Sequence, residues 1–327
     1  MKKYELNQIA LYKCRTKRRL AELLLVNLKD LIKLGEMPVY YTFFKDKKDS
    51  IDKRKITAPV KKLRSVQKRI FCLLERAIRP VWLISGEKGK CYIDNAAIHK
   101  ESNYILTVDI KKFFDSCKRE YVYRFFVDVM KNSSDVACIL TDLTTYDGKI
   151  PTGTSTSQLL AFYAYINMFE EIKMLAESFN YKFSLYVDDM TFSSTDDMKW
   201  RVFISKIDII LKKYGHSLSQ KKIKYYSKRK PKIITGVVIN RNHNLCIPNK
   251  LQMKIIREFK KMKIVERPLS DNNKKLLLQC QQVSGMVASA RSIKRTSFPE
   301  INRITNSKLR RIIKEINEIN KNRKRYK

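Results

Sequence analysis

Two adjacent carboxylates occupy the stretch of the chain with the clearest chemical potential, Tyr186-Val187-Asp188-Asp189. Residues 181–194 alternate between apolar and polar types, which predicts a β-hairpin with the acidic pair at its turn. Like charges this close repel and raise the pKa of one carboxyl group unless a cation lies beside them. Carboxylate oxygens suit Mg²⁺, which takes one or two protein carboxylates together with phosphate groups. Taken alone, an ordinary solvated Asp-Asp turn remains the alternative.

A third carboxylate, Asp109, closes the short apolar strand predicted at residues 104–109. A strand-end Asp beside a hairpin-turn Asp pair provides ligands for two metal ions about 3.5–4 Å apart. Such a pair of ions stabilises the attacking and leaving oxygens of a phosphoryl displacement. Phe113 and Phe114 follow Asp109, and core packing is the simpler expectation for Phe113.

A run of small residues at 150–157, Ile-Pro-Thr-Gly-Thr-Ser-Thr-Ser, leads into a predicted helix. Gly153 and a helix N-terminus allow a backbone to approach a phosphate or a base pair closely. A simple Ser/Thr helix cap is the alternative.

The elements that must position these residues follow from hydrophobic periodicity. A basic amphipathic helix is predicted at residues 15–35, ended by Gly35, and a charged hairpin or loop at 46–58. Further helices are predicted at 61–79, 120–143, 157–178 and 200–214, a strand at 232–240, and helical structure from 250 onward.

Composition restricts the class of protein. The 327 residues are 44% hydrophobic and 31% charged, which indicates a globular protein. Lys and Arg number 69 against 32 Asp and Glu, a formal charge of +37, so a polyanion such as nucleic acid is the expected partner and a membrane surface the second choice. No 18-residue apolar run and no signal peptide is evident. Seven scattered cysteines without a C-x-x-C pair argue against disulfides or structural zinc and fit a reducing cytosol.

The order of these motifs resembles that of reverse transcriptases, and the chain looks like a bacterial retron-type reverse transcriptase over roughly residues 50–290. Arg54-x-Ile56-x-x-Pro59 resembles the first fingers motif of the family. Asn95-Ala96-Ala97-Ile98-His99 and Ile234-Thr235-Gly236 resemble two retron elements, and residues 215–222 resemble the lysine-bearing motif that follows the catalytic hairpin.

The resemblance implies an α/β (α+β) right-hand polymerase with fingers, a ferredoxin-like palm and a helical thumb. The implied domains are a helical extension at 1–45, fingers at 46–103 with 120–150, a palm at 104–240 and a basic, RNA-binding thumb at 241–327.

It also implies roles for individual residues. Two Mg²⁺ ions would be held by Asp109, Asp188 and Asp189, and Lys222 would act as a catalytic general acid. The nucleotide and primer–template site would use Arg54 to clamp phosphate, Phe114 to exclude a ribose 2′-hydroxyl, and Gly153.

The implied partners are dNTPs and a structured non-coding RNA that serves as template and, through an internal guanosine 2′-OH, as primer. The product would be a branched RNA–DNA molecule (msDNA), made in the bacterial cytoplasm for anti-phage defence. An effector protein and a host RNase H would take part, and no membrane. Asn95, His99, Thr235 and Gly236 would serve RNA binding and priming. In the alternative, Asn95 and His99 would only pin the fingers to the palm.

Two residues depart from the family pattern, and two alternative assignments fit the sequence. Thr152 replaces the Gln of the usual P-Q-G motif, and Val187 stands where many retron enzymes carry Ala. The alternatives are another bacterial defence or intron-derived reverse transcriptase, and a catalytically inactive RNA-binding scaffold. The three aspartates favour an enzyme.

Overall fold

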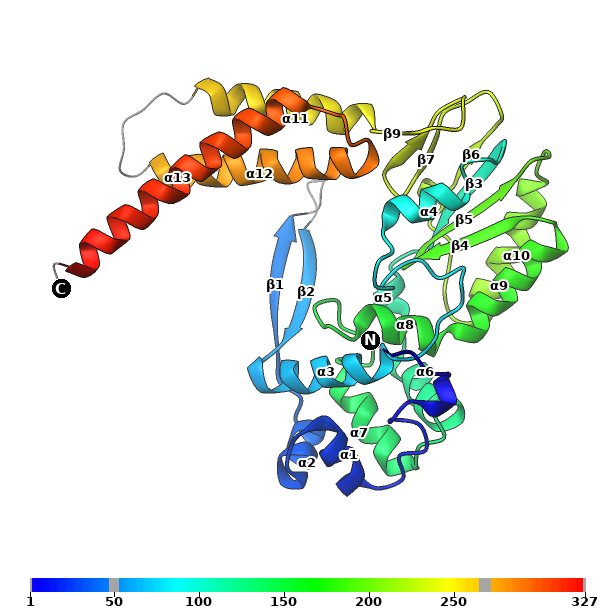
Figure 1. Cartoon of the computed structure of the whole chain (residues 1–327). Helices are drawn as coiled ribbons and strands as arrows, with labels where there is room; N and C mark the ends of the chain where they lie inside the picture. Colours follow the sequence, from blue (N-terminus) through cyan, green and yellow to red (C-terminus); the bar gives the residue numbers. More distant parts are fainter. Residues whose placement is uncertain (1, 47–52, 265–271, 326–327) are drawn as a thin grey trace. The chain divides into compact units, whose positions relative to one another are not determined.

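A computed structural model describes residues 2–46, 53–264 and 272–325, a mixture of helices and sheets (Figure 1). The chain forms two compact units. The first contains residues up to Cys91 together with Asn103–Tyr225, and the second contains Tyr92–Ser102 together with the chain from Tyr226 onward. The boundary therefore separates residues 92–102 from the range predicted as fingers.

Two short helices, α1 (Lys17–Leu24) and α2 (Leu28–Glu36), replace the single helix predicted at residues 15–35. The first ends at Leu25, whose φ of 58° is left-handed, and Asn27 caps the second by accepting from the backbone N–H of Asp30. Gly35 lies buried inside α2 and does not end it, so that prediction was wrong.

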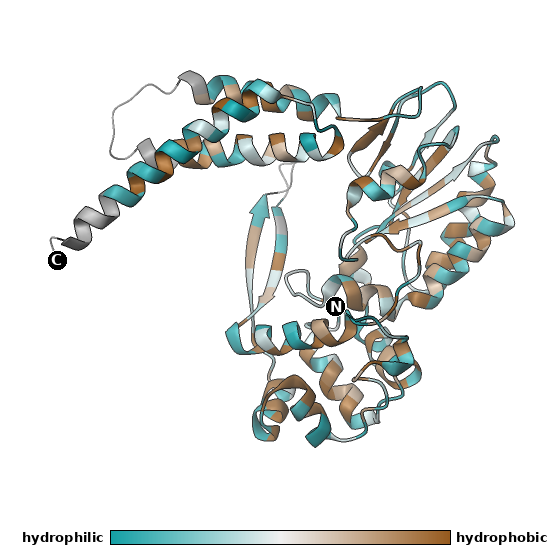
Figure 2. Cartoon of the chain, viewed as in Figure 1, coloured by the Kyte–Doolittle hydropathy of each residue, from teal (hydrophilic) through white to brown (hydrophobic). Residues whose placement is uncertain are grey.

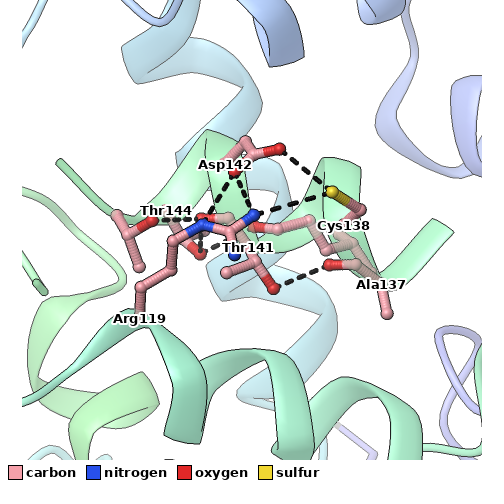
Figure 3. Close-up of polar contacts among 8 residues, drawn as sticks. Arg119, Ala137, Cys138, Thr141, Asp142 and Thr144 are labelled. Carbon is pink, nitrogen blue, oxygen red and sulfur yellow. Dashed lines mark hydrogen bonds and ion pairs between the residues drawn. The ribbon is translucent and has the colours of Figure 1, made fainter. Parts of the chain in front are cut away.

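A hairpin and a group of helices follow. Strands β1 (Tyr40–Asp46) and β2 (Lys53–Pro59) pair antiparallel, with the residues between them outside the described part. Helices α3 (Lys61–Leu74), α6 (Arg119–Arg124) and α7 (Ser134–Thr144) lie in the same unit. Figure 3 shows Arg119 of α6 reaching Asp142 and Cys138 of α7, with Nη2 2.6 Å from the Asp142 Oδ1 atom.

The central sheet of the first unit has the strand order β4-β5-β3-β6. Its strands are β3 (Tyr104–Asp109), β4 (Lys182–Tyr186), β5 (Asp189–Ser194) and β6 (Lys224–Tyr226). Helices α8 (Ser157–Ala164) and α9 (Ile166–Ser178) precede β4, and α10 (Trp200–Lys213) follows β5. This order and connectivity match a ferredoxin-like β-α-β-β-α-β arrangement.

The second unit combines a small sheet with three long helices. Strands β7 (Lys232–Ile234), β8 (Val237–Ile239) and β9 (Leu245–Cys246) form the sheet, and α4 (Tyr92–Ile98) packs against β8. The predicted strand at 232–240 is therefore a hairpin. Helices α11 (Asn249–Ile264), α12 (Asn272–Ile293) and α13 (Pro299–Arg325) have their own core, which includes Ile255, Val287 and Ile312. Figure 2 shows α13 as a largely hydrophilic helix interrupted by hydrophobic residues.

Within the part of the chain that the structure describes, we find no helix with the length and apolar character needed to cross a bilayer.

Candidate active site

Antiparallel pairing brings together carboxylates that are distant in the sequence. Asp109, the last residue of β3, lies directly opposite Asp189, the first residue of β5. Asp188 belongs to the two-residue connection between β4 and β5, because Tyr186 pairs with Asp189. Residues opposite each other on antiparallel strands have Cβ atoms about 4.5–5.5 Å apart. The predicted hairpin and strand are confirmed, and they place the three carboxylates at one end of the sheet.

Lys222 joins this group from a different part of the sequence. Its Nζ atom lies 2.7 Å from Oδ2 of Asp109, whose side chain is only 8% exposed. The segment before it is held on the end of β3, since the backbone N–H of Ser219 donates to the Asp109 carbonyl at 2.8 Å. Partial burial disfavours the Lys222 charge, but the bond to Asp109 and the nearby aspartates outweigh it, so the pKa of Lys222 is raised.

Negative charge is crowded around the Asp189 carboxyl group. Loss of water around the carboxyl group, followed by repulsion from Asp188 and Asp109, raises the pKa of Asp189 to about 7. The side chain nevertheless has an exposed surface. A cation from solvent can therefore reach this carboxyl group and stabilise its charged form.

The donor set fits Mg²⁺ in part. Among residues 2–46, 53–264 and 272–325 no cluster of three or more Asp, Glu, His or Cys side chains is arranged as a complete metal site. Magnesium ordinarily uses one or two protein carboxylates and completes its shell with water and substrate phosphates. Paired strands with facing carboxylates, one of them with a raised pKa, suit an ion that arrives with a triphosphate.

The two aromatic side chains that follow Asp109 lie in different environments. Phe113, in the short helix α5 (Phe113–Ser116), is buried against Phe169 and His216, with ring centroids 6.1 and 5.4 Å away. Phe114 is half-buried and packs at the margin of the same core. Phe113 is thus a core residue, as expected, and Phe114 keeps a surface for other contacts.

Gly153 is positioned by close backbone contact with β2. Its N–H donates to the Thr57 carbonyl at 2.9 Å, and a Cβ added at residue 153 would lie 2.6 Å from that same oxygen. The glycine therefore serves a close approach between the loop and the hairpin. Thr152 beside it donates to the Lys55 carbonyl at 3.4 Å.

The predicted phosphate clamp, Arg54, lies in β2 opposite Lys45. Its side chain lies outside the part of the chain that the structure describes, so its role stays a prediction.

The two remaining predicted elements come together in the second unit. Asn95 and His99 are both fully buried around α4. Thr235 and Gly236, with φ of 45° and 88°, form the two-residue turn between β7 and β8, a turn of the type I′ class. The Thr235 hydroxyl donates to the Tyr92 carbonyl at 2.8 Å, which fastens the turn to α4.

Comparisons with known proteins agree with this geometry. A family model described as reverse transcriptase (RNA-dependent DNA polymerase) matches residues 45–239. The retron Se72 reverse transcriptase of Salmonella heidelberg is 31% identical over 146 residues, which is 44% of this chain and 38% of that protein. The retron Ec83 reverse transcriptase of Escherichia coli is 23% identical over 231 residues, covering 67% of this chain and 74% of the relative. The retron Ec86 reverse transcriptase of the same species is 26% identical over 188 residues, covering 57% and 58%.

Proposed function

Because the chain belongs to the reverse transcriptase family, we propose that it is an RNA-directed DNA polymerase of the retron type. The observation that carries this proposal is the pairing of Asp109 with Asp189 beside Asp188, inside the region that the family model matches. Two acidic groups on paired strands, with a third in the adjoining turn, suit phosphoryl transfer, in which charge develops on the attacking and leaving oxygens.

Two Mg²⁺ ions, held by Asp109, Asp188 and Asp189, would supply Lewis-acid activation of the primer hydroxyl and neutralise the triphosphate. Lys222 neutralises Asp109 in the structure, and would turn toward the leaving pyrophosphate to donate a proton. Its exposed side chain, 62% accessible, has the freedom to make this movement. Phe114 would pack under the deoxyribose, and Arg54 would bind phosphate through its guanidinium group.

A structured non-coding RNA would serve as template and primer, with synthesis starting from an internal guanosine 2′-OH. The names of the relatives support the retron assignment, as does the bond from Thr235 to Tyr92 of α4, the helix that carries Asn95. The product would be a branched RNA–DNA molecule (msDNA) made in the bacterial cytoplasm. An effector protein in anti-phage defence and a host RNase H would complete the system.

Asn95 and His99 would brace the segment that carries them. Full burial of both side chains supports this role over direct contact with the primer, because a buried side chain cannot meet RNA without rearrangement.

The retron assignment is tested by comparing two substrates under the same conditions. The wild-type protein should synthesise DNA on its cognate RNA without an added primer, and this DNA should stay linked to RNA after denaturation. It should also extend a DNA primer annealed to a generic RNA. If the protein extended the annealed primer but made no DNA on its cognate RNA, it would still be a reverse transcriptase, and the retron assignment would be contradicted. Asn95→Ala and His99→Ala should impair both reactions equally if the pair is structural.

A further inference from the structure

The turn that carries Asp188 has an unfavourable backbone conformation. Val187 has a φ of +62°, in the left-handed region that favours glycine. A β-branched residue is strongly disfavoured there, because its Cβ substituents crowd the backbone. Contacts from other segments are therefore needed to hold Val187, which directly precedes Asp188 and Asp189, in this conformation.

A side chain from a distant part of the sequence provides a contact at that position. The backbone N–H of Val187 donates to the Ser85 Oγ atom at 2.9 Å, and Ser85 is only 4% exposed. This hydrogen bond is made by the backbone of the strained residue itself.

The segment that carries Ser85 runs along the edge of β4 opposite β5. The N–H of Leu185 donates to the Trp82 carbonyl at 2.8 Å, and the N–H of Ile84 donates to the Leu185 carbonyl at 3.0 Å. Leu83 forms a parallel bridge with Leu185. The main chain of residues 82–84 is therefore paired with the strand that leads into the turn.

A buried arginine fixes the other end of this segment. Arg79 Nη1 donates to the Gly86 carbonyl at 2.6 Å, and its Nε lies 3.5 Å from Glu87 Oε2. The Arg79 side chain is 2% exposed, and Lys3 pairs with Glu87 at 2.9 Å. Ser85 thus stands on a short segment that is held on both sides.

We infer that Ser85 is a positioning residue for catalysis, which holds Val187 in its left-handed conformation and so fixes Asp188 and Asp189. The inference rests on the proposed function, because the turn matters for rate only if the aspartates carry the reaction. Ser85 itself does not touch substrate in this account and acts through the Val187 backbone.

The first test compares Ser85→Ala with wild type in steady-state extension of an annealed DNA primer on RNA. Loss of the acceptor leaves the Val187 N–H without its partner, so kcat should fall about tenfold. The KM for dNTP should stay within about twofold, since the nucleotide contacts are untouched. Ser85→Thr should recover most of the rate, because a cavity of about 180 Å³ lined by Ser85 and Val187 has room for a methyl group.

Ser193→Ala is the matched control for loss of a buried hydroxyl. Ser193 lies in β5 and is 1% exposed, on the same sheet but away from the turn. It should keep the wild-type kcat. If Ser85→Ala and Ser193→Ala lowered Tm and kcat alike, Ser85 would be a structural residue and the inference would be overturned.

The second test removes the strain itself. Glycine adopts a φ of +62° without a Cβ penalty, so Val187→Gly should reduce the need for the Ser85 contact. In the Val187→Gly background, Ser85→Ala should lower kcat less than about threefold. An equal loss in both backgrounds would contradict the proposed link. Absence of synthesis by the wild-type protein would instead refute the proposed function, so the two failures are distinguishable.

Discussion

Among the individual residues of the site, Asp109 faces both a lysine and a second carboxyl group. Its carboxylate is nearly buried and needs a positive partner, which Lys222 supplies at 2.7 Å. Asp189 lies opposite it with a pKa raised to about 7, so negative charge is present in excess of what one lysine balances. The flanking patterns predicted the strand and the hairpin that bring the three aspartates together, and their catalytic role stays a prediction. The sequence did not predict Ser85, because a lone serine has no periodicity and its contact lies 102 positions away.

Phe114→Ala should admit ribonucleotides. Removing the half-buried ring takes away bulk at the position proposed for the deoxyribose, so the preference for dNTP over rNTP should fall on the order of tenfold or more. Single-nucleotide incorporation kinetics measure this ratio. Phe114→Tyr keeps the ring and should keep the preference. An unchanged ratio in the Ala variant would assign the selection of the sugar to another residue.

His216 should make the stability of the fold depend on pH. The ring is 3% exposed, and neither of its nitrogens has a hydrogen-bond partner among the described residues. Burial, followed by repulsion from Lys118, lowers the pKa of His216 to about 4. The unfolded chain, with a His pKa of about 6.5, binds more protons than the folded chain between pH 6.5 and 4. The free energy of unfolding should therefore fall as pH drops through this window, by on the order of 2–3 kcal/mol.

His216→Phe should remove that part of the pH dependence, because Phe cannot bind a proton and suits a site between Phe113 and Tyr165. Urea unfolding at pH 5 and pH 8 measures the difference. A His216→Phe protein with an unaltered slope would show that other groups cause the dependence.

At the scale of helices and strands, the hydrophobic pattern predicted elements that are determined by short stretches of sequence. The strand at 104–109 and the hairpin at 181–194 are both present, the first predicted from a short apolar run and the second from alternation. Both are more completely buried than an alternating pattern requires, since consecutive residues of β4 and β5 are buried. The helix predicted at 15–35 failed because periodicity continued through Leu25, where the backbone turns left-handed before Asn27 caps a new helix.

The grouping of residues 92–102 with the second unit could not be predicted, since it depends on tertiary contacts. The hydroxyl of Thr235 reaches across 143 positions to the Tyr92 carbonyl, and the His243 ring bonds to the Lys100 carbonyl at 2.6 Å. The two retron elements were recognised separately in the sequence. The bond from Thr235 to Tyr92 connects the second of them to α4, the helix that carries Asn95.

Gly153→Ala should disturb the contact between the loop and β2. The new Cβ would lie 2.6 Å from the Thr57 carbonyl, a backbone atom, so the loop must move and the Gly153 N–H bond must weaken. We expect a loss of about 1–3 kcal/mol in the free energy of unfolding and reduced primer extension. Urea titration and extension assays measure the two effects.

Gly285→Ala provides the matched control for that substitution. Gly285 lies in α12 with no atom within 4 Å of an added Cβ, so alanine should stabilise the helix by up to about 1 kcal/mol. If Gly153→Ala behaved like Gly285→Ala, close packing would not be the reason for the glycine.

For the whole molecule, the formal charge of +37 is the dominant property. A chain with this excess of Lys and Arg gains free energy when phosphates replace its counterions, whatever the base sequence. Selection of one RNA must then come from RNA shape and single-stranded contacts. Composition alone predicted a nucleic-acid partner, but it did not separate a polymerase from an RNA-binding scaffold.

Binding to a generic RNA should be strong at low salt and weaken steeply as salt increases. If six to ten phosphates are neutralised, affinity should drop by about 10³-fold or more between 50 and 200 mM salt. Fluorescence anisotropy at several salt concentrations gives the slope. A shallow slope would mean that few of the basic residues contact the RNA backbone.

Catalysis by the aspartates is tested most directly by dNTP incorporation with Asp188→Asn on an annealed DNA primer and RNA template. The substitution keeps the size of the side chain and removes one negative charge, so the variant should retain its fold and bind RNA at least as tightly as wild type. With Mg²⁺ present, wild type should extend the primer and Asp188→Asn should show at least a thousandfold lower rate, on the order expected when a group essential to metal-ion catalysis is lost. Undiminished incorporation by a correctly folded Asp188→Asn protein would contradict the assignment of this site as the polymerase centre.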